Sequence, residues 1–323
     1  MSLRIIRPGI LDTIQDTGRY GYQHLGIHPG GSMDRFSARL ANALLGKLPD
    51  GPVIEIHFPA PKIRFETPTV IALSGADFSP LINGDPVPMH HPIALESESV
   101  LQFSHMEQGA RCYLSVLHDF KLEKWMGSYS TNLKAGAGGY QGHPLRKDDR
   151  IEFTGNYNIS HLLQGKNCHV LPWKANDIVD TRNEIECLMG SEWNWLTREA
   201  QQDFLQNWYL ISNDADRMGY RLNGAPLAMN REEQLVSSAV TFGTIQLLPD
   251  GQLIILMADH ATTGGYPRIA SVISAHLPIL AQKKPNSSIR FKMVDLSTAE
   301  KKVFEQKKYL QQLQNACKFR MKI

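Results

Sequence analysis

"TIQLLPDGQLIILMADHATTGGYPRIA", residues 244–270, is the stretch that decides the fold class of this chain. Two strand-sized apolar runs, "TIQLL" and "QLIILMA", flank the turn signal "PDGQ". The second run ends in a segment that combines an acid, a histidine, threonines, two adjacent glycines, a tyrosine and an arginine. This pattern predicts buried strands that lead directly into either an elaborate turn or a binding site.

Similar apolar runs recur along the whole chain and predict a mainly β protein. Glycine, proline or asparagine usually bounds them, as in "NGDPVP" and "KKPNSS". The spacing of the runs is typical of a sandwich or a barrel. They include "PVIEIHF" (52–58), "TVIALSGA" (69–76), "RCYLSVL" (111–117), "RIEF" (150–153) and "SIRFKMV" (288–294).

Helices are expected in few places. Residues 33–46 carry an apolar stripe between Asp34 near the start and Gly46 at the end, which are usual start and stop signals. Residues 191–209 form a weaker candidate that begins at Ser191. Both segments are therefore predicted to interrupt the strands.

The C-terminal segment, residues 297–319, predicts an amphipathic helix. It opens with a Ser-x-x-Glu capping box at Ser297 and Glu300. Because its apolar stripe is narrow, we expect it to pack on its own domain. The stripe consists of Val303, Leu310, Leu313 and Cys317.

The composition indicates a globular protein with a sizeable core. The chain has 323 residues, of which 42% are hydrophobic and 20% charged. Its 34 basic and 32 acidic residues nearly balance, so no basic stripe for nucleic acid is expected. The longest apolar runs are strand-sized and "MSLRIIRPG" is not a signal region, so we expect a cytoplasmic protein that does not span a membrane.

The chain divides into two strand-rich halves, separated by a polar and irregular region at residues 153–178. We place the boundary within it, giving lobes at residues 1–165 and 166–323. The four cysteines are widely spaced and no Cys/His cluster has zinc spacing, so no metal is expected.

The first candidate motif is "TIQDTGRYGYQHLGIHPGGSMDRF", residues 13–36. Its glycines imply tight turns, and Asp16, Arg19 and Asp34 lie among them. An arginine fork and glycine amides suit a carboxylate or phosphate group. A strand–turn–helix entry in which Asp16 pairs with Arg19 explains the same residues.

The second candidate motif is "NDADRMGYRLNG", residues 213–224. Arg217, Tyr220 and Arg221 combine guanidinium groups with a phenol around a Met-Gly turn. These groups are suited to binding an anionic substrate, and a charged β-hairpin explains them equally well.

The third candidate motif is the polar segment that follows the strand "QLIILM". We expect Asp259, His260 and Tyr266 to serve proton transfer or substrate orientation. The remaining residues suit an oxyanion or a carboxylate, and the alternative is a wide turn. These binding candidates are Thr262, Thr263, Gly264, Gly265 and Arg268.

Together these motifs resemble the allophanate hydrolase subunit 2 family, also called the biotin-dependent carboxyltransferase or KipA-like family. The resemblance rests on residues 15–46 and 243–282, with "SGADFSPLINGDPVP", "GSYST", "DRMGYRLNG" and "IRFKMV" between and after them in the family's order. It implies a cyclophilin-like β-barrel, carboxyltransferase-type fold. The likeness to cyclophilin concerns shape and not prolyl isomerase activity.

The resemblance also implies a function. Family members of this length commonly act as the C component of a bacterial ATP-dependent 5-oxoprolinase, which converts 5-oxo-L-proline to L-glutamate. It further implies a KipI-like B component, a LamB/YcsF-like A component and ATP, used through the complex. Two alternatives stay open: a carboxyltransferase-type protein of urea breakdown, and a non-catalytic regulator that binds a KipI-like protein.

This chain departs from the family pattern at several positions. Ala261 stands where the family often has glutamine, and Tyr129 where it usually has arginine. Asp148-Asp149 replaces an expected Gly-Asp turn. These departures concern substrate and partner surfaces more than the fold.

Overall fold

A computed structural model describes residues 1–176, 182–231 and 235–321. The chain forms two compact units, which are described separately. Unit 1 comprises Met1–Gly18, Asp34–Val179 and Lys307–Ile323, and unit 2 comprises Arg19–Met33 and Asp180–Gln306. Unit 1 therefore extends beyond the expected boundary at residue 165, because β13 (Cys168–Val170) still pairs with β8 (Pro92–Leu95).

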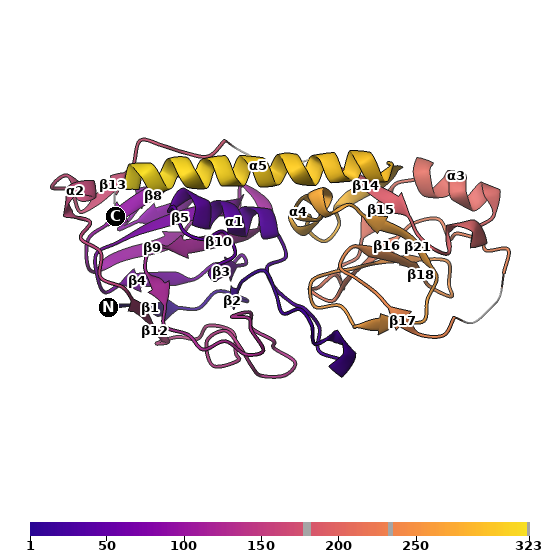
Figure 1. Ribbon diagram of the computed structural model, residues 1–323, viewed down its shortest axis with the longest axis horizontal. Coiled ribbons are helices and arrows are strands. Elements are labelled where there is room, and N and C mark those ends of the chain that lie inside the picture. Colours follow the sequence, from indigo (N-terminus) through magenta and orange to yellow (C-terminus); the bar gives the residue numbers. More distant parts are fainter. Residues whose placement is uncertain (177–181, 232–234, 322–323) are drawn as a thin grey trace. The chain divides into compact units, whose positions relative to one another are not determined.

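Unit 1 contains a pair of β-sheets, coloured indigo to magenta in Figure 1. In the described residues, one sheet has seven strands in the order β11 (Asp119–Phe120), β12 (Arg150–Thr154), β1 (Ser2–Arg7), β4 (Lys62–Phe65), β9 (Ser99–Phe103), β6 (Pro80–Ile82) and β7 (Asp85–Pro86). The other has six, in the order β13, β8, β5 (Thr69–Asp77), β10 (Gln108–Val116), β3 (Val53–Ile56) and β2 (Thr13–Gln15).

Strand β5 shows why its sequence is continuously apolar instead of alternating. Ile71 and Leu73 belong to the core that unit 1 builds from residues of both sheets. Val70 and Ala72 belong to a second core, which they share with α1 (Arg35–Leu44). Since both faces of the strand are covered, every position from Val70 to Leu73 is apolar.

The turn between β6 and β7 follows the prediction from its sequence. Asn83 and Gly84 have φ values of 55° and 97°, which is the left-handed pair that a tight two-residue hairpin requires. Ile82 pairs with Asp85 across the turn. The Asn-Gly signal therefore sets the register of this hairpin.

Unit 2 is built around a closed barrel, drawn in orange in Figure 1. Among the described residues its strands follow the order β14 (Glu184–Met189), β21 (Arg268–Val272), β18 (Thr244–Leu247), β19 (Leu253–Leu256), β16 (Gly219–Asn223), β15 (Tyr209–Ile211) and β22 (Ser288–Met293). The prediction of a mainly β fold with a barrel and few helices is confirmed. A short ladder outside the barrel joins β17 (Ser238–Ala239) to β20 (Thr263–Gly264).

The second predicted helix is wrong in its start. A 3-10 turn, η2 (Trp193–Trp195), comes first, and α3 (Arg198–Gln206) begins after Thr197. The Thr197 hydroxyl accepts a hydrogen bond from Ala200 N at 3.1 Å, so Thr197 and not Ser191 is the N-cap. Phe204 of α3 stacks on Phe291 inside the barrel core.

The C-terminal helix α5 (Leu296–Met321) is present, but its predicted cap is wrong. Asp295 accepts hydrogen bonds from Thr298 N at 2.8 Å and Ser297 Oγ at 3.1 Å, so Asp295 occupies the capping position. Val303 packs on a cluster of unit 2, whereas the other stripe residues pack on α1 and β8 in unit 1.

The other helical segments are η1 (Gln23–Leu25), α2 (Ser160–Leu163), η3 (Ser274–His276) and α4 (Leu277–Ala281). Within the described residues, no helix is long and apolar enough to cross a membrane.

Unit 1 also contains a carboxyl group that is fully buried, that of Asp12. Its Oδ2 accepts a hydrogen bond from Gly9 N at 2.6 Å. Burial raises the pKa of Asp12 to about 7, more than the hydrogen bonds lower it. The folded protein therefore holds this proton at pH values where the unfolded chain, with a carboxyl pKa of 3.8, releases it.

We expect Asp12→Asn to flatten the dependence of stability on pH. Between pH 4 and pH 7 the folded state binds more protons at Asp12 than the unfolded state does. The stability that Asp12 contributes is therefore present at low pH and is lost as pH rises. From pH 5 to pH 8 the free energy of unfolding of the wild type should fall by about 3 kcal/mol relative to that of Asp12→Asn. Urea unfolding of both proteins at each pH measures this difference. An unchanged difference would show that Asp12 is ionised in the folded state.

Candidate functional site

The three sequence motifs contribute to one cluster in unit 2, centred on Arg217 and Asp259. Arg217 precedes β16 and Asp259 follows β19, and these strands pair with Gly219 opposite Leu256. The strand ends therefore lie side by side, and Asp259 N donates a hydrogen bond to Arg217 O at 2.7 Å. The fold thus joins the second motif to the third.

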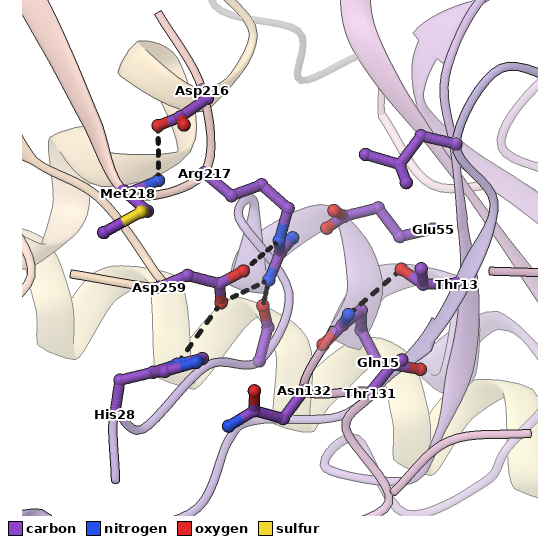
Figure 2. Close-up of polar contacts among 12 residues, drawn as sticks. Thr13, Gln15, His28, Glu55, Thr131, Asn132, Asp216, Arg217, Met218 and Asp259 are labelled. Carbon is purple, nitrogen blue, oxygen red and sulfur yellow. Dashed lines mark hydrogen bonds and ion pairs between the residues drawn. The ribbon is translucent and has the colours of Figure 1, made fainter. Parts of the chain in front are cut away.

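The side chains of Arg217 and Asp259 form a bidentate ion pair. Arg217 Nε lies 2.8 Å from Asp259 Oδ2, and Nη2 lies 3.0 Å from Oδ1. Both side chains are largely buried, at 8% and 15% exposed. Two parallel charge-assisted hydrogen bonds fix the orientation of both groups. Figure 2 shows the pair between Asp216 and His28.

The first motif reaches this ion pair through its glycine turn. Arg217 Nη2 also donates to Gly31 O at 2.7 Å, and His28 Nδ1 lies 3.6 Å from Asp259 Oδ1. Gly30 has a φ of 63°, and a Cβ there would lie 3.5 Å from Asp259 Oδ1. The glycine therefore provides the left-handed turn that brings the histidine to the carboxylate. The sequence prediction included Asp259 and Arg217 but missed His28, whose signal is its place before Pro-Gly-Gly.

His260 and Tyr266, the other predicted proton-transfer residues, are in different surroundings. His260 is buried, and its Nδ1 donates to Ala261 O at 2.6 Å. Tyr266 is 45% exposed. In the third motif, Asp259 is the residue that joins the cluster.

The backbone of Thr263 and Gly264 takes part in strand pairing. These residues form β20, opposite Ala239 and Ser238 of β17, and Val240 N donates to Thr262 O. A Cβ on Gly264 would lie 2.5 Å from Gln246 Nε2, so the glycine permits a close approach to that side chain. Gly265 follows directly, and the segment from Thr262 to Gly265 runs along this ladder.

Arg268 makes a second bidentate ion pair, with Glu192. Its Nε and Nη2 lie 3.0 and 2.8 Å from the two carboxylate oxygens, and its backbone N donates to Oε2 at 2.8 Å. The hydrogen bond from the Arg268 side chain holds the pKa of Glu192 below its usual value. Glu192 was missed by the sequence prediction because no local signal links residues so far apart in the chain.

Tyr220 and Arg221 lie on opposite faces of β16, since successive residues of a strand alternate. Tyr220 is buried in the barrel core, whereas Arg221 is exposed on its outer face. Both were predicted to bind substrate, and only one of them is on the solvent side of the barrel.

In unit 1, Asp16 organises the "GSYST" segment. Its Oδ1 accepts hydrogen bonds from Ser128 Oγ at 2.7 Å, Ser130 Oγ at 2.6 Å and Gly18 N at 2.8 Å. Its Oδ2 accepts one from Tyr129 N at 2.7 Å. The two carboxylate oxygens of Asp16 therefore fix two loops to each other.

The other predicted residues of the first motif also make structural contacts. Asp34 is the N-cap of α1 and accepts from Ser37 N at 2.8 Å and Ser37 Oγ at 2.6 Å. Arg19 is buried in unit 2, where its backbone N donates to Pro29 O. In the parts of the chain that the structure describes, no group of three or more His, Cys, Asp or Glu residues could hold a metal.

Comparison with known proteins places this arrangement in a family. The chain is 34% identical over 301 residues to the C component of the 5-oxoprolinase of Haemophilus influenzae, covering 93% of this chain and 94% of that one. It is 34% identical over 311 residues to the C component of the 5-oxoprolinase of Escherichia coli, covering 96% and 97%.

A solved structure and a family model also match this chain. The crystal structure of the K. lactis urea amidolyase matches with a TM-score of 0.86 and 25% identity, over 97% of this chain and 20% of that chain. The model of the carboxyltransferase domain, subdomain A and B, matches residues 25–293. This chain therefore belongs to the carboxyltransferase domain family, subdomains A and B.

Proposed function

We propose that the chain is the C component of an ATP-dependent 5-oxoprolinase, which cleaves 5-oxo-L-proline to L-glutamate. The observation that carries the proposal is the meeting of three motifs at the Arg217–Asp259 ion pair, in a chain that matches two proteins of that name along nearly their whole length. The proposed partners are a KipI-like B component and a LamB/YcsF-like A component. The complex would act in the cytoplasm, where ATP is available.

Similarity favours this proposal over a role in urea breakdown. The chain is 34% identical to the two 5-oxoprolinase proteins and 25% identical to the K. lactis urea amidolyase. The regulator hypothesis predicts binding to a KipI-like protein without any effect on turnover. Measured turnover therefore separates it from the proposal.

Opening a lactam requires an electrophilic carbonyl and a proton for the departing nitrogen. ATP can supply the first by phosphorylating the amide oxygen, after which one water adds and the C–N bond breaks as the nitrogen takes up a proton. A second water then hydrolyses the resulting acyl phosphate, which releases phosphate and leaves the carboxylate of glutamate. The overall balance is one ATP and two waters consumed, with ADP, phosphate and glutamate formed. A positioned acid–base group typically contributes about 10²–10⁴-fold to such a step.

We assign proton transfer to His28 and its orientation to Asp259, since imidazole titrates near neutral pH and Asp259 Oδ1 lies 3.6 Å from its Nδ1. Arg217 fixes Asp259 through the bidentate pair. Arg217 and Arg268, which were expected to bind an anionic group of the substrate, are each paired with a carboxylate. We therefore propose that the triphosphate is bound chiefly by the other components of the complex.

The proposal is tested by glutamate release from 5-oxoproline and ATP, using the three purified components. We expect His28→Asn to lower kcat at least 100-fold with little change in KM, while the complex still assembles. His24→Asn is the matched control, because His24 is an exposed histidine in the same segment, and it should keep wild-type turnover. If His28→Asn retains more than half of the activity, the assignment of proton transfer is wrong. If no combination of components releases glutamate, the proposed function fails.

A further inference from the structure

One face of the barrel in unit 2 combines an exposed aromatic ring, an exposed leucine and arginines. We call it the Trp208 face and define it by Trp208, Leu210, Arg221 and Arg290. Trp208 is 51% exposed and Leu210 is 37% exposed. Arg221 is the exposed arginine of the second motif, and it is not part of the Arg217–Asp259 cluster described above.

Strand pairing makes these residues neighbours on one surface. Leu210 of β15 lies opposite Asn223 of β16 on one side and opposite Ser288 of β22 on the other. Arg221 is two residues from Asn223, and Arg290 is two residues from Ser288. Both arginines therefore lie diagonal to Leu210 on the same face. Residues diagonal in this way lie about 7–8 Å apart, within reach of long side chains.

The aromatic ring on this face is held in place by one of the arginines. The Arg290 guanidinium lies 5.4 Å from the centre of the Trp208 ring, and its Nη2 lies 2.8 Å from Glu184 Oε2. This stack presents a rigid, half-exposed tryptophan to solvent. A tryptophan whose position is already fixed loses little conformational entropy when a partner binds.

Electrostatics indicates what kind of partner fits. Glu184 is shared by Arg290 and Lys292, at 2.8 and 3.6 Å, so cations outnumber it on this face. Arg221 is exposed, and within the described ranges no carboxylate lies within ion-pair distance of it. The complementary surface is therefore acidic, with an apolar recess for the indole ring. Tryptophan and arginine are also the side chains most often found at the energetic centre of protein interfaces.

We infer that the Trp208 face binds an acidic protein surface on another component of the complex. This inference rests on the proposed function for the existence of such a component. The choice of occupant rests on charge complementarity between the basic side chains of this face and an acidic partner surface.

The test is isothermal titration of the purified chain against each of the other two purified components, at low and high salt. We expect Trp208→Ala and Arg221→Glu each to weaken binding to one of them at least tenfold, and Arg221→Glu to reduce the salt dependence. Arg320→Glu is the matched control, because it reverses the charge of another exposed arginine, which lies in unit 1 beside the Trp173 ring at 5.9 Å. It should bind with wild-type affinity.

Two measurements keep the inference separable from folding and from the proposed function. Arg221 is exposed, and the described residues give its side chain no hydrogen bond or ion pair, so Arg221→Glu should keep the wild-type melting temperature. Unchanged affinity of both variants would overturn the inference, even if the complex releases glutamate. A dimer of the wild-type chain alone that Trp208→Ala dissociates would also overturn it, in favour of a second copy as the occupant. Weakened binding without glutamate release would support the face and reject the proposed function.

Discussion

Asp259→Ala is expected to destabilise unit 2 by about 3–5 kcal/mol, because it removes the carboxylate of a largely buried, bidentate ion pair with Arg217. Turnover of the complex should fall with it, since His28 then loses the carboxylate that orients it. Urea unfolding and glutamate release measure the two effects. Adding Arg217→Met should recover part of the lost stability, because neither charge of the Arg217–Asp259 pair then remains.

The control for this prediction is Asp216→Ala. Asp216 Oδ1 accepts hydrogen bonds from Met218 N at 2.7 Å and Gly219 N at 3.0 Å, so it stabilises the same turn without an arginine partner. Asp216→Ala should lower the free energy of unfolding by about 1 kcal/mol. If Asp259→Ala costs no more than this control, the ion pair does not hold the cluster together.

Asp16→Ala is expected to destabilise unit 1 by about 3 kcal/mol or more. The substitution removes a buried carboxylate that accepts four hydrogen bonds and leaves the hydroxyls of Ser128 and Ser130 without this acceptor. Asp16→Asn should cost less, because one amide oxygen remains as an acceptor while its NH₂ group faces other donors. Chemical denaturation followed by circular dichroism measures both variants.

Asp77→Ala provides the comparison for Asp16. Asp77 Oδ1 accepts one hydrogen bond from Ser79 N at 2.8 Å, which is a turn-capping contact. This variant should cost about 1 kcal/mol. Full stability of Asp16→Ala together with lost turnover would instead place Asp16 in substrate binding, as the sequence motif suggested.

The strands and the first helix were predicted correctly, because their sequence signals lie within a short stretch of the chain. The seven apolar runs all became strands, because alternation and flanking turn residues depend only on neighbours in the chain. The first helix and its Asp34 cap were predicted for the same reason. The starts of α3 and α5 were wrong because several Ser, Thr and Asp residues competed for each cap.

The candidate site was predictable only in part. Asp259, Arg217 and the glycine turn each lie in a motif that is rich in polar residues and glycine, which is a local feature of the sequence. Their contact with one another depends on the pairing of β16 with β19 and on the turn around Gly30, neither of which any single motif shows. The pairing of Arg268 with Glu192 was missed for the same reason.

By itself the sequence determined the mainly β class, the strands and the three polar motifs, because each follows from the order of residues within a short window. The tertiary structure alone decided which polar residues bind each other. It paired Arg217 with Asp259, brought His28 to them, and placed Tyr220 inside the barrel and Arg221 outside it. The physical reason is that strand pairing joins residues far apart in the chain, and a change of one position along a strand moves a side chain to the opposite face.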